Sequence, residues 1–322
     1  MKLQDMRFIK LNRDKSPRET FDKFYSYELV QYHQDVGVLM DEPFVVFDVD
    51  DNTEFLKLRE IIKSRGIKCN IMKTSRGGHF WFKSPQPLTN NIDIKTPIGV
   101  TVDVRSWGKH SQAMVKTNGE WREWVDTLYD FDYLDEVPFW LTPINHDIDI
   151  IDLKDGEGRN QILFNYIIVL YRYLSKEQIR ETYQIINEFI LGDKLTPKEM
   201  DSIVRDEAFD NLRPSFFDKK RFMFDEFATW FASNDNIMRR GRLLYIFDGK
   251  SYVYDTALIE RKMIGHISDL SKTQRTEVME YLKLIAKEVP PQAYYHVAVD
   301  NGIIDIRDRT FIPHSKDYFL PQ

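Results

Sequence analysis

Two aspartates at the end of an apolar run are the first residues whose type and spacing suggest chemistry. Residues 44–49 are rich in Val and Phe and end in a polar turn, which predicts a buried strand. Because side chains alternate along a strand, Asp48 and Asp50 share one face, about 7 Å apart. Buried carboxylates are costly unless a cation holds them, and their oxygens suit Mg²⁺ or Mn²⁺. A strand end followed by a helix-capping aspartate explains the same residues without a metal.

A predicted hairpin brings positive charge and a histidine to one turn. Residues 68–82 form two apolar runs on either side of the turn Ser75-Arg76-Gly77-Gly78. Two adjacent glycines let backbone N–H groups approach an anion, and Lys73 and Arg76 add positive charge there. His79 follows the turn and would donate to the same anion. An ordinary hairpin turn, with a histidine at the edge of the core, is the alternative.

A third stretch, residues 100–105, adds one carboxylate on another strand. Valines alternate with polar residues there, so Asp103 and Arg105 share the face opposite the valines. Three carboxylates can hold two divalent ions, the arrangement that activates a 3′-hydroxyl and stabilises a leaving pyrophosphate. A surface ion pair between Asp103 and Arg105, which would contribute little, is the alternative.

The neighbouring sequence indicates the elements that position these residues. Residues 36–40 predict a strand beside the strand at 44–49, and residues 52–65 carry apolar side chains at helical spacing. Strand followed by helix places the aspartates at a carboxyl end of a strand, where open α/β sheets commonly bind ligands. Short strands are expected at 112–116 and 121–123, and the acidic residues 126–155 predict a linker or wrapping segment.

Composition limits the class of protein. The 322 residues favour two or three domains, and 42% hydrophobic residues exclude global disorder. The single cysteine, Cys69, excludes a disulfide framework and a four-cysteine zinc site. No apolar run approaches the length of a membrane span and no signal peptide opens the chain, so we expect a cytoplasmic protein without a membrane partner. Because the net charge is −6, polynucleotide binding must come from local basic patches.

The order of the three motifs resembles the archaeo-eukaryotic primase superfamily, specifically the primase-polymerase domains of phage and plasmid replication proteins. That family carries a strand with Asp-x-Asp or Asp-x-Glu, a small-residue turn that ends in His, and a strand with one Asp. Here these are Asp48 with Asp50, the turn from Ser75 to His79, and Asp103. The resemblance implies two Mg²⁺ or Mn²⁺ ions on the three aspartates and contact of His79 with a nucleoside triphosphate. Further candidates for nucleotide binding are Lys73, Ser75, Arg76, Gly77, Gly78 and Arg105.

The resemblance continues beyond the first 150 residues. Residues 156–160, Gly-Glu-Gly-Arg-Asn, resemble the start of the small helical domain that follows the catalytic domain in phage primases. For Arg159 and Asn160, a plain helix start is the alternative. Residues 245–249, 301–305 and 312–314 resemble the domain that precedes the superfamily-three helicase motor.

We therefore expect an α+β fold in three parts. These are a primase-polymerase domain at 1–150, with a mixed or antiparallel sheet and flanking helices, a small helical domain at 151–215, and an α+β domain at 216–322. The resemblance further implies the N-terminal part of a longer primase-helicase from the bacterial host cytoplasm. A homo-hexamer would then form through a helicase motor that follows residue 322.

Two basic clusters in the last part are candidates for binding a single-stranded DNA template. The first is Lys219, Lys220 and Arg221; the second is Arg239, Arg240 and Arg242. Aromatic residues lie near both clusters, so phosphate contacts could combine with base stacking. A solvated charged surface is the alternative.

Three functions agree with these patterns. The first is template-dependent nucleotidyl transfer by a DNA primase-polymerase that uses two metal ions. The second is a non-catalytic platform for DNA binding and assembly of a ring helicase. The third is a two-metal nuclease, in which the same carboxylates activate water. A nuclease needs no triphosphate site, so the turn before His79 argues against it.

Overall fold

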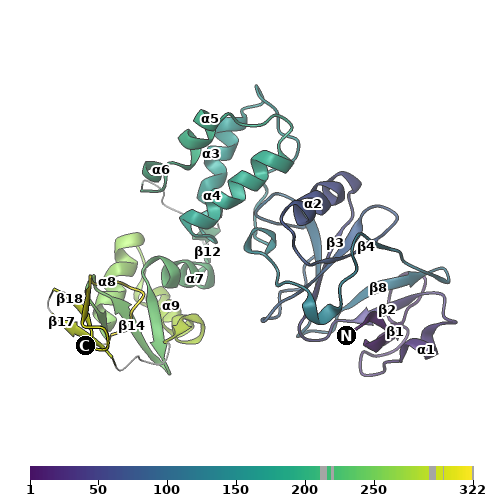
Figure 1. Cartoon of the computed structure of the whole chain (residues 1–322), viewed down its shortest axis with the longest axis horizontal. Coiled ribbons are helices and arrows are strands. Elements are labelled where there is room, and N and C mark those ends of the chain that lie inside the picture. The colour runs from purple at the N-terminus through teal and green to yellow at the C-terminus, as the bar shows by residue number, and fades with distance from the viewer. Residues whose placement is uncertain (211–215, 219–220, 290–294, 300, 321–322) are drawn as a thin grey trace. The chain divides into compact units, whose positions relative to one another are not determined.

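A computed structural model of the chain describes residues 1–210, 216–218, 221–289, 295–299 and 301–320. The fold is mixed α and β with mainly antiparallel sheets, as the sequence predicts. The chain divides into two units, which Figure 1 colours from purple to yellow along the sequence. We call residues 1–166 with 180–204 the N-terminal unit and residues 167–179 with 205–322 the C-terminal unit.

The N-terminal unit contains two antiparallel sheets. The six-stranded sheet has the order β10-β4-β5-β3-β7-β6. Its strands are β10 (Trp124–Val125), β4 (Asn70–Lys73), β5 (Gly78–Lys83), β3 (Phe44–Val49), β7 (Thr101–Ser106) and β6 (Ile94–Lys95). The four-stranded sheet consists, in spatial order, of β1 (Phe8–Lys10), β2 (Val36–Leu39), β8 (Gln112–Thr117) and β9 (Glu120–Trp121). The short elements η1 (Leu3–Asp5) and α1 (Tyr27–Val30) flank β1 in the sequence.

The strand predicted beside the Asp48 strand lies in the other sheet. β2 pairs with β1 and β8, whereas β3 pairs with β5 and β7. Val38 of β2 and Val46 of β3 belong to one buried cluster, so the two strands contribute to the same core from different sheets. The prediction was wrong on this point because apolar patterning indicates burial but not which strand is the neighbour.

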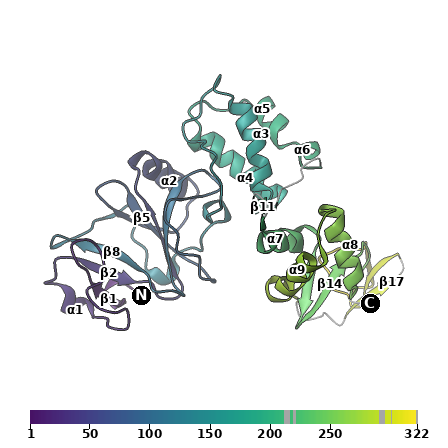
Figure 2. The same cartoon turned by 180° about the vertical axis from the view of Figure 1, so that it is seen from behind.

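The six-stranded sheet is buried on both faces. Trp81 and Val46 pack into the core shared with the four-stranded sheet. Helix α2 (Asn52–Ser64) contacts the sheet through Phe55, whose ring lies 5.5 Å from that of Phe80, and Figures 1 and 2 show the helix beside it. Asp51 caps α2 by accepting from two backbone N–H groups. The helix-capping role considered for this position is therefore confirmed for Asp51.

Residues 126–155 wrap the N-terminal unit. The segment contains the short elements η2 (Phe131–Tyr133) and η3 (Phe139–Leu141), and it buries Phe131, Trp140 and Ile150 almost completely. Full burial of one such side chain contributes about 1.5–3 kcal/mol, so the segment stabilises the unit as well as connecting its parts.

The helices that follow are α3 (Arg159–Leu170), α4 (Lys176–Ile185) with its π-helical continuation η4 (Ile186–Ile190), α5 (Pro197–Val204) and α6 (Asp206–Asp210). Because α3 and α4 each contribute residues to both units, the boundary between the units does not coincide with the ends of the helical segment. The three-part division at residues 150 and 215 stays a prediction.

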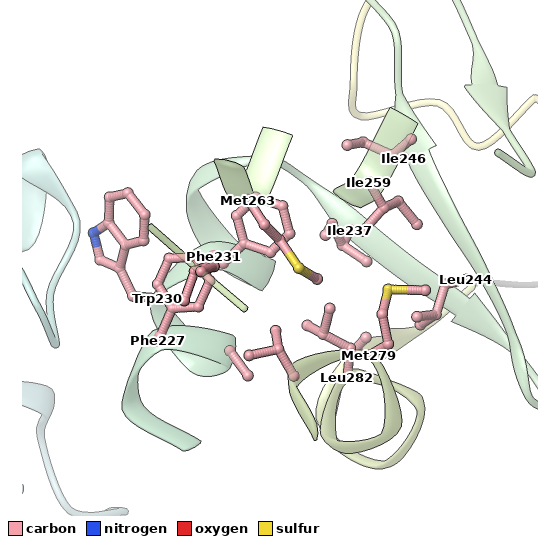
Figure 3. Close-up of a cluster of buried hydrophobic side chains, with 14 of the residues drawn as sticks. Phe227, Trp230, Phe231, Ile237, Leu244, Ile246, Ile259, Met263, Met279 and Leu282 are labelled. Carbon is pink, nitrogen blue, oxygen red and sulfur yellow. The ribbon is translucent and has the colours of Figure 1, made fainter. Parts of the chain in front are cut away.

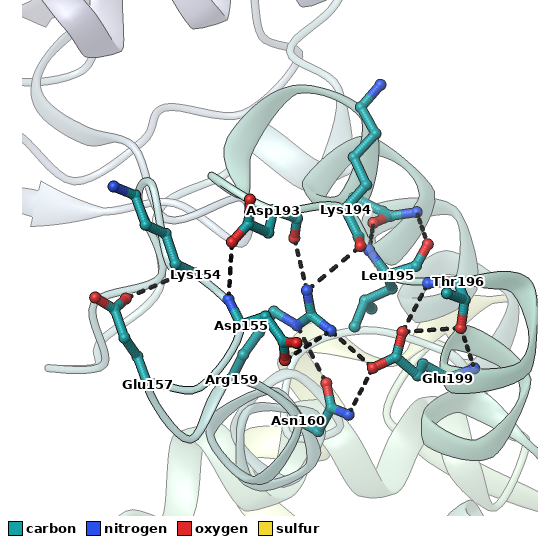
Figure 4. Close-up of polar contacts among 11 residues, drawn as sticks. Lys154, Asp155, Glu157, Arg159, Asn160, Asp193, Lys194, Leu195, Thr196 and Glu199 are labelled. Carbon is teal, nitrogen blue, oxygen red and sulfur yellow. Dashed lines mark hydrogen bonds and ion pairs between the residues drawn. The ribbon is translucent and has the colours of Figure 1, made fainter.

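Arg159 connects the start of α3 to the segment before α5 and to the first turn of α5, as Figure 4 shows. Its side chain is 4% exposed and donates to the Asp193 carbonyl at 3.0 Å and to the Glu199 carboxylate at 2.7 Å. Asn160 donates to the same carboxylate. Arg159 therefore has a structural role at the helix start.

In the C-terminal unit, three helices pack on a four-stranded sheet. The helices are α7 (Phe224–Asn234), α8 (Thr256–His266) and α9 (Lys272–Ile285). The sheet consists, in spatial order, of β15 (Tyr252–Val253), β14 (Leu243–Phe247), β13 (Ile237–Arg240) and β16 (Lys287–Glu288), with β13 and β16 parallel. Figure 3 shows Phe227, Met263 and Leu282 meeting in the core between these elements.

Five further strands complete the described part of this unit. They are β11 (Phe217–Asp218), β12 (Arg221–Phe222), β17 (His296–Val299), β18 (Gly302–Asp305) and β19 (Thr310–Ile312). β11 and β12 pair as a two-stranded antiparallel sheet, and the other three strands form an antiparallel sheet of their own. None of the helices in the described ranges combines the length and the apolar character needed to cross a lipid bilayer.

Candidate nucleotidyl-transfer site

Asp48 lies in the middle of a row of polar side chains that crosses the six-stranded sheet. Its register partner in β5 is His79, and its register partner in β7 is Asp103. Because paired residues of neighbouring strands point to the same face, the three side chains emerge side by side. The fold therefore brings the three sequence motifs together.

The row borders two cavities. A cavity of about 250 Å³ is lined by acidic side chains, among them Asp48, Asp50, Glu54 and Asp103. A second cavity, of about 440 Å³, shares Asp48, Asp50 and Asp103 and is also lined by His79, Arg105 and Arg122. A ligand can therefore contact carboxylates and cationic or imidazole groups at once.

One oxygen of the Asp48 carboxylate has no hydrogen-bond partner in the part of the chain that the structure describes. Oδ2 lies 3.2 Å from Nε2 of His79, but Oδ1 is buried and accepts no hydrogen bond from the described residues. Burial raises the pKa of Asp48, but its contact with His79 and the charges of Arg122 and Arg105 lower that pKa below its usual range. The carboxylate is therefore ionised, and its free oxygen is a ready position for a cation.

The other two aspartates are each paired with an arginine. Asp50 contacts Arg76 at 2.7 Å, and both side chains are more than half exposed. Asp103 contacts Arg105 at 2.9 Å, which is the ion pair considered from the sequence. Burial raises the pKa of Asp103, and the charge of Asp48 acts in the same direction. Both features coexist at Asp103: it pairs with Arg105 and lies opposite Asp48.

The donor set suits a hard divalent cation. In the part of the chain that the structure describes, no group of three or more His, Cys, Asp and Glu side chains is arranged to hold a metal ion. Asp50 and Asp103 would have to leave their arginines to join Asp48 around one. The unpartnered Oδ1 of Asp48 and the carboxylates around it fit such an ion, because Mg²⁺ and Mn²⁺ prefer oxygen ligands.

Two other acidic residues line the small cavity and were not singled out from the sequence. Glu54 accepts from the backbone N–H of Thr101 at 2.6 Å, and burial raises the pKa of Glu54. Asp93 donates its backbone N–H to Asp103 at 3.0 Å. The helical spacing of the apolar residues placed Glu54 on the polar face of the predicted helix. Its contact with Thr101 of β7 could not be predicted from that pattern.

The turn before His79 is shaped by packing. A side chain on Gly77 would place a Cβ atom 1.9 Å from the Val49 carbonyl oxygen, and one on Gly78 would meet the Phe55 ring. The Gly77 N–H donates to the Thr74 hydroxyl at 3.0 Å. The need for glycine at both positions is therefore explained by close approach to β3 and α2.

The remaining candidates around this turn lie outside the two cavities. Lys73 contacts the Asn52 side-chain oxygen at 3.0 Å and lies over the Phe55 ring. Ser75 is exposed in the turn. Of Lys73, Arg76 and Arg105, Arg105 alone lines one of these two cavities, while Arg76 reaches the site through Asp50.

Arg122 belongs to the site and was missed in the sequence. Its guanidinium lies 2.9 Å from Nε2 of His79 and lines the larger cavity. Burial lowers the pKa of Arg122, although the charges of Asp48 and Asp50 act in the opposite direction. Its position between Trp121 and Trp124 could have indicated a functional arginine. The sequence predicted one strand over residues 121–123, however, whereas the chain passes there from the four-stranded sheet to the six-stranded sheet.

The basic candidates of the C-terminal unit fall into three groups. Lys219 and Lys220 lie outside the described residues. Arg239 is held within the unit, because it donates to the Ala286 carbonyl at 2.9 Å and pairs with Glu288. Arg221, Arg240 and Arg242 are exposed. The cluster around β13 therefore offers two exposed arginines rather than three.

Comparison with protein-family models and with curated protein sequences finds no match to this chain.

Proposed function

We propose that the N-terminal unit carries out template-dependent nucleotidyl transfer, as a DNA primase-polymerase. The observation that supports this best is the position of Asp48 between His79 and Asp103, with one buried, unpartnered oxygen beside a cavity lined by carboxylates. The same row offers oxygen ligands at one end and groups suited to a phosphate at the other. That combination is what joining a nucleoside triphosphate to a 3′-hydroxyl requires.

In this proposal, Asp48, Asp50 and Asp103 would hold two Mg²⁺ or Mn²⁺ ions. Divalent ions at such carboxylates activate the attacking hydroxyl and neutralise charge on the leaving pyrophosphate. His79 would donate to the triphosphate and hold it in line for attack. Arg76 and Arg105 would exchange their aspartates for phosphate oxygens as the ions bind, so the charges inside the site stay balanced.

The wider role follows from the same resemblance. We propose that the chain is part of a primase-helicase, acts on single-stranded DNA and nucleoside triphosphates, and joins a homo-hexamer through a helicase motor. Exposed Arg240 and Arg242 of the C-terminal unit are the favoured contacts to the template strand. No observation favours the nuclease or the non-catalytic platform over this function.

The test uses single-stranded template, labelled nucleotides and Mn²⁺. Wild-type protein is compared with Asp48→Asn/Asp50→Asn and with Asp201→Asn, which changes an exposed aspartate of α5. New chains that disappear only in the double variant support the polymerase. Shortening of the template would instead indicate a nuclease, and absence of both would leave the DNA-binding platform.

A further inference from the structure

Arg122 is fixed where the chain crosses from one sheet to the other. β9 pairs with β8 in the four-stranded sheet, and β10 pairs with β4 in the six-stranded sheet. Between them, the Arg122 N–H donates to the Val115 carbonyl at 2.9 Å, and the Glu123 carbonyl accepts from the Lys73 N–H at 2.8 Å. The backbone is therefore held from both sides, and the side chain has a fixed origin beside the larger cavity.

The guanidinium of Arg122 forms no direct ion pair with a carboxylate of the described residues, although the charges of Asp48 and Asp50 act on it from farther away. Its partners are the carbonyl oxygen of Met114 at 3.1 Å, the sulfur of the same residue, and Nε2 of His79. Arginine stays charged in proteins, and a partly buried charge that forms no direct ion pair is costly. Such a group, at the wall of a cavity, is suited to an anion.

The contact with His79 is incompatible with the contact between His79 and Asp48. The guanidinium can only donate and the carboxylate can only accept, yet both face the same Nε2 atom, at 2.9 and 3.2 Å. If Nε2 accepts from Arg122, it cannot donate to Asp48. If it donates to Asp48, it presents a hydrogen to Arg122. Nδ1 of His79 is buried and has no hydrogen-bond partner among the described residues, so it favours neither arrangement of the ring protons.

We propose that Arg122 and His79 together bind a phosphate group. A phosphate oxygen between the two side chains would accept from both and thereby resolve the conflict at Nε2. It would also release Oδ2 of Asp48, so that both oxygens of that carboxylate become free. The planar guanidinium suits this role because it can offer two parallel N–H groups to one phosphate.

The ligand class is a polyphosphate, and under the proposed function it is the triphosphate of the incoming nucleotide. This step rests on that function, but the phosphate site itself does not. A backbone phosphate of single-stranded DNA has the same chemistry, although it carries less charge than a triphosphate. Comparing the two ligands distinguishes these sources.

The test measures binding of inorganic tripolyphosphate in EDTA by calorimetry, so that no metal and no catalysis are involved. Arg122→Gln keeps a polar side chain near Met114 and should weaken binding about tenfold or more. Arg122→Lys should weaken binding less, because lysine keeps the positive charge but loses the paired N–H donors of the guanidinium. Arg65→Gln is the matched control, since Arg65 pairs with Glu181 and lines neither cavity. A (dT)₁₂ oligonucleotide should bind these three variants and the wild type alike.

The outcomes separate this inference from the proposed function. Equal tripolyphosphate affinity in the wild type and Arg122→Gln, or no binding to the wild type, overturns the inference even if the protein polymerises. If Arg122→Gln loses only oligonucleotide binding, the arginine contacts DNA, and this result also overturns the inference. If Arg122 is needed for tripolyphosphate binding but the protein synthesises no chains, the phosphate site is supported and the proposed polymerase function is contradicted. If Arg122→Gln does not fold, unchanged affinity in Arg122→Lys overturns the inference and weaker affinity supports it.

Discussion

Asp48 and His79 are register partners in the β3–β5 ladder, and their side chains meet at 3.2 Å between Oδ2 and Nε2. The contact joins two motifs that are thirty-one positions apart in the sequence. It places the imidazole at the border between the acidic row and the larger cavity. His79 is therefore in position to act on a ligand that also reaches Asp48.

Replacing His79 by alanine should lower nucleotide affinity about tenfold, because one hydrogen bond to a charged phosphate is lost. Binding of a fluorescent nucleoside triphosphate with Mn²⁺ measures this. His146→Ala is the matched control, since His146 is a partly buried histidine of the same unit that contacts Tyr166 and lines neither cavity. Unchanged affinity in His79→Ala would limit His79 to a structural role.

Gly77→Ala should destabilise the N-terminal unit by about 3 kcal/mol, because the new methyl group would overlap the Val49 carbonyl. Urea unfolding measures the change in the free energy of unfolding. Gly265→Ala makes the same chemical change in α8, where the added atom would meet open space, and should stabilise the C-terminal unit by about 0.5–1 kcal/mol. Equal effects of the two substitutions would contradict the packing argument.

Local sequence patterns predicted the bounds of the strands and helices of the site better than they predicted which strands pair with one another. The apolar run at 44–49 is β3 with the predicted bounds, and the helix predicted at 52–65 ends at Ser64. Alternation and helical spacing depend only on residues that are close in the sequence, so they can be recognised in a single sequence. The assignment of β2 to a sheet depends on contacts between distant segments, and that prediction was wrong.

Charge patterns predicted side-chain partners least well. Arg239 resembled part of an exposed basic cluster, but it binds the Ala286 carbonyl and Glu288, which lie far along the chain. Arg122 lies near His79 only because the chain changes sheets at that residue. In both cases the partner is set by tertiary structure, which neighbouring residues do not encode.

Asp126→Asn should destabilise the N-terminal unit by about 1 kcal/mol at pH 7. Asp126 accepts from Arg59 at 2.6 Å and also pairs with Lys63, which lowers the pKa of Asp126 from 3.8 to about 2. The shift alone corresponds to a larger effect, but Lys63 is about half exposed and solvent weakens that pair.

The pH dependence of that variant follows from the sign of the shift. A carboxyl with a lowered folded-state pKa stabilises the fold above its unfolded pKa, and this stabilisation is lost as pH falls through the folded value. The difference between Asp126→Asn and wild type should therefore be constant above pH 5 and shrink between pH 4 and pH 2. Urea unfolding at pH 7, 4 and 3 measures it, and a difference that grows toward pH 3 would exclude this ion pair as its cause.

Arg240→Ala/Arg242→Ala should weaken binding of single-stranded DNA and reduce its salt dependence. Each arginine that contacts a phosphate releases counter-ions, so losing two contacts should lower the slope of log affinity against log salt by about 1.4. Arg261→Ala/Lys272→Ala removes the same charge from exposed positions on α8 and α9 and is the matched control. If both double variants change the slope equally, the effect comes from net charge and not from the arginines around β13. If neither changes it, the template strand is bound elsewhere.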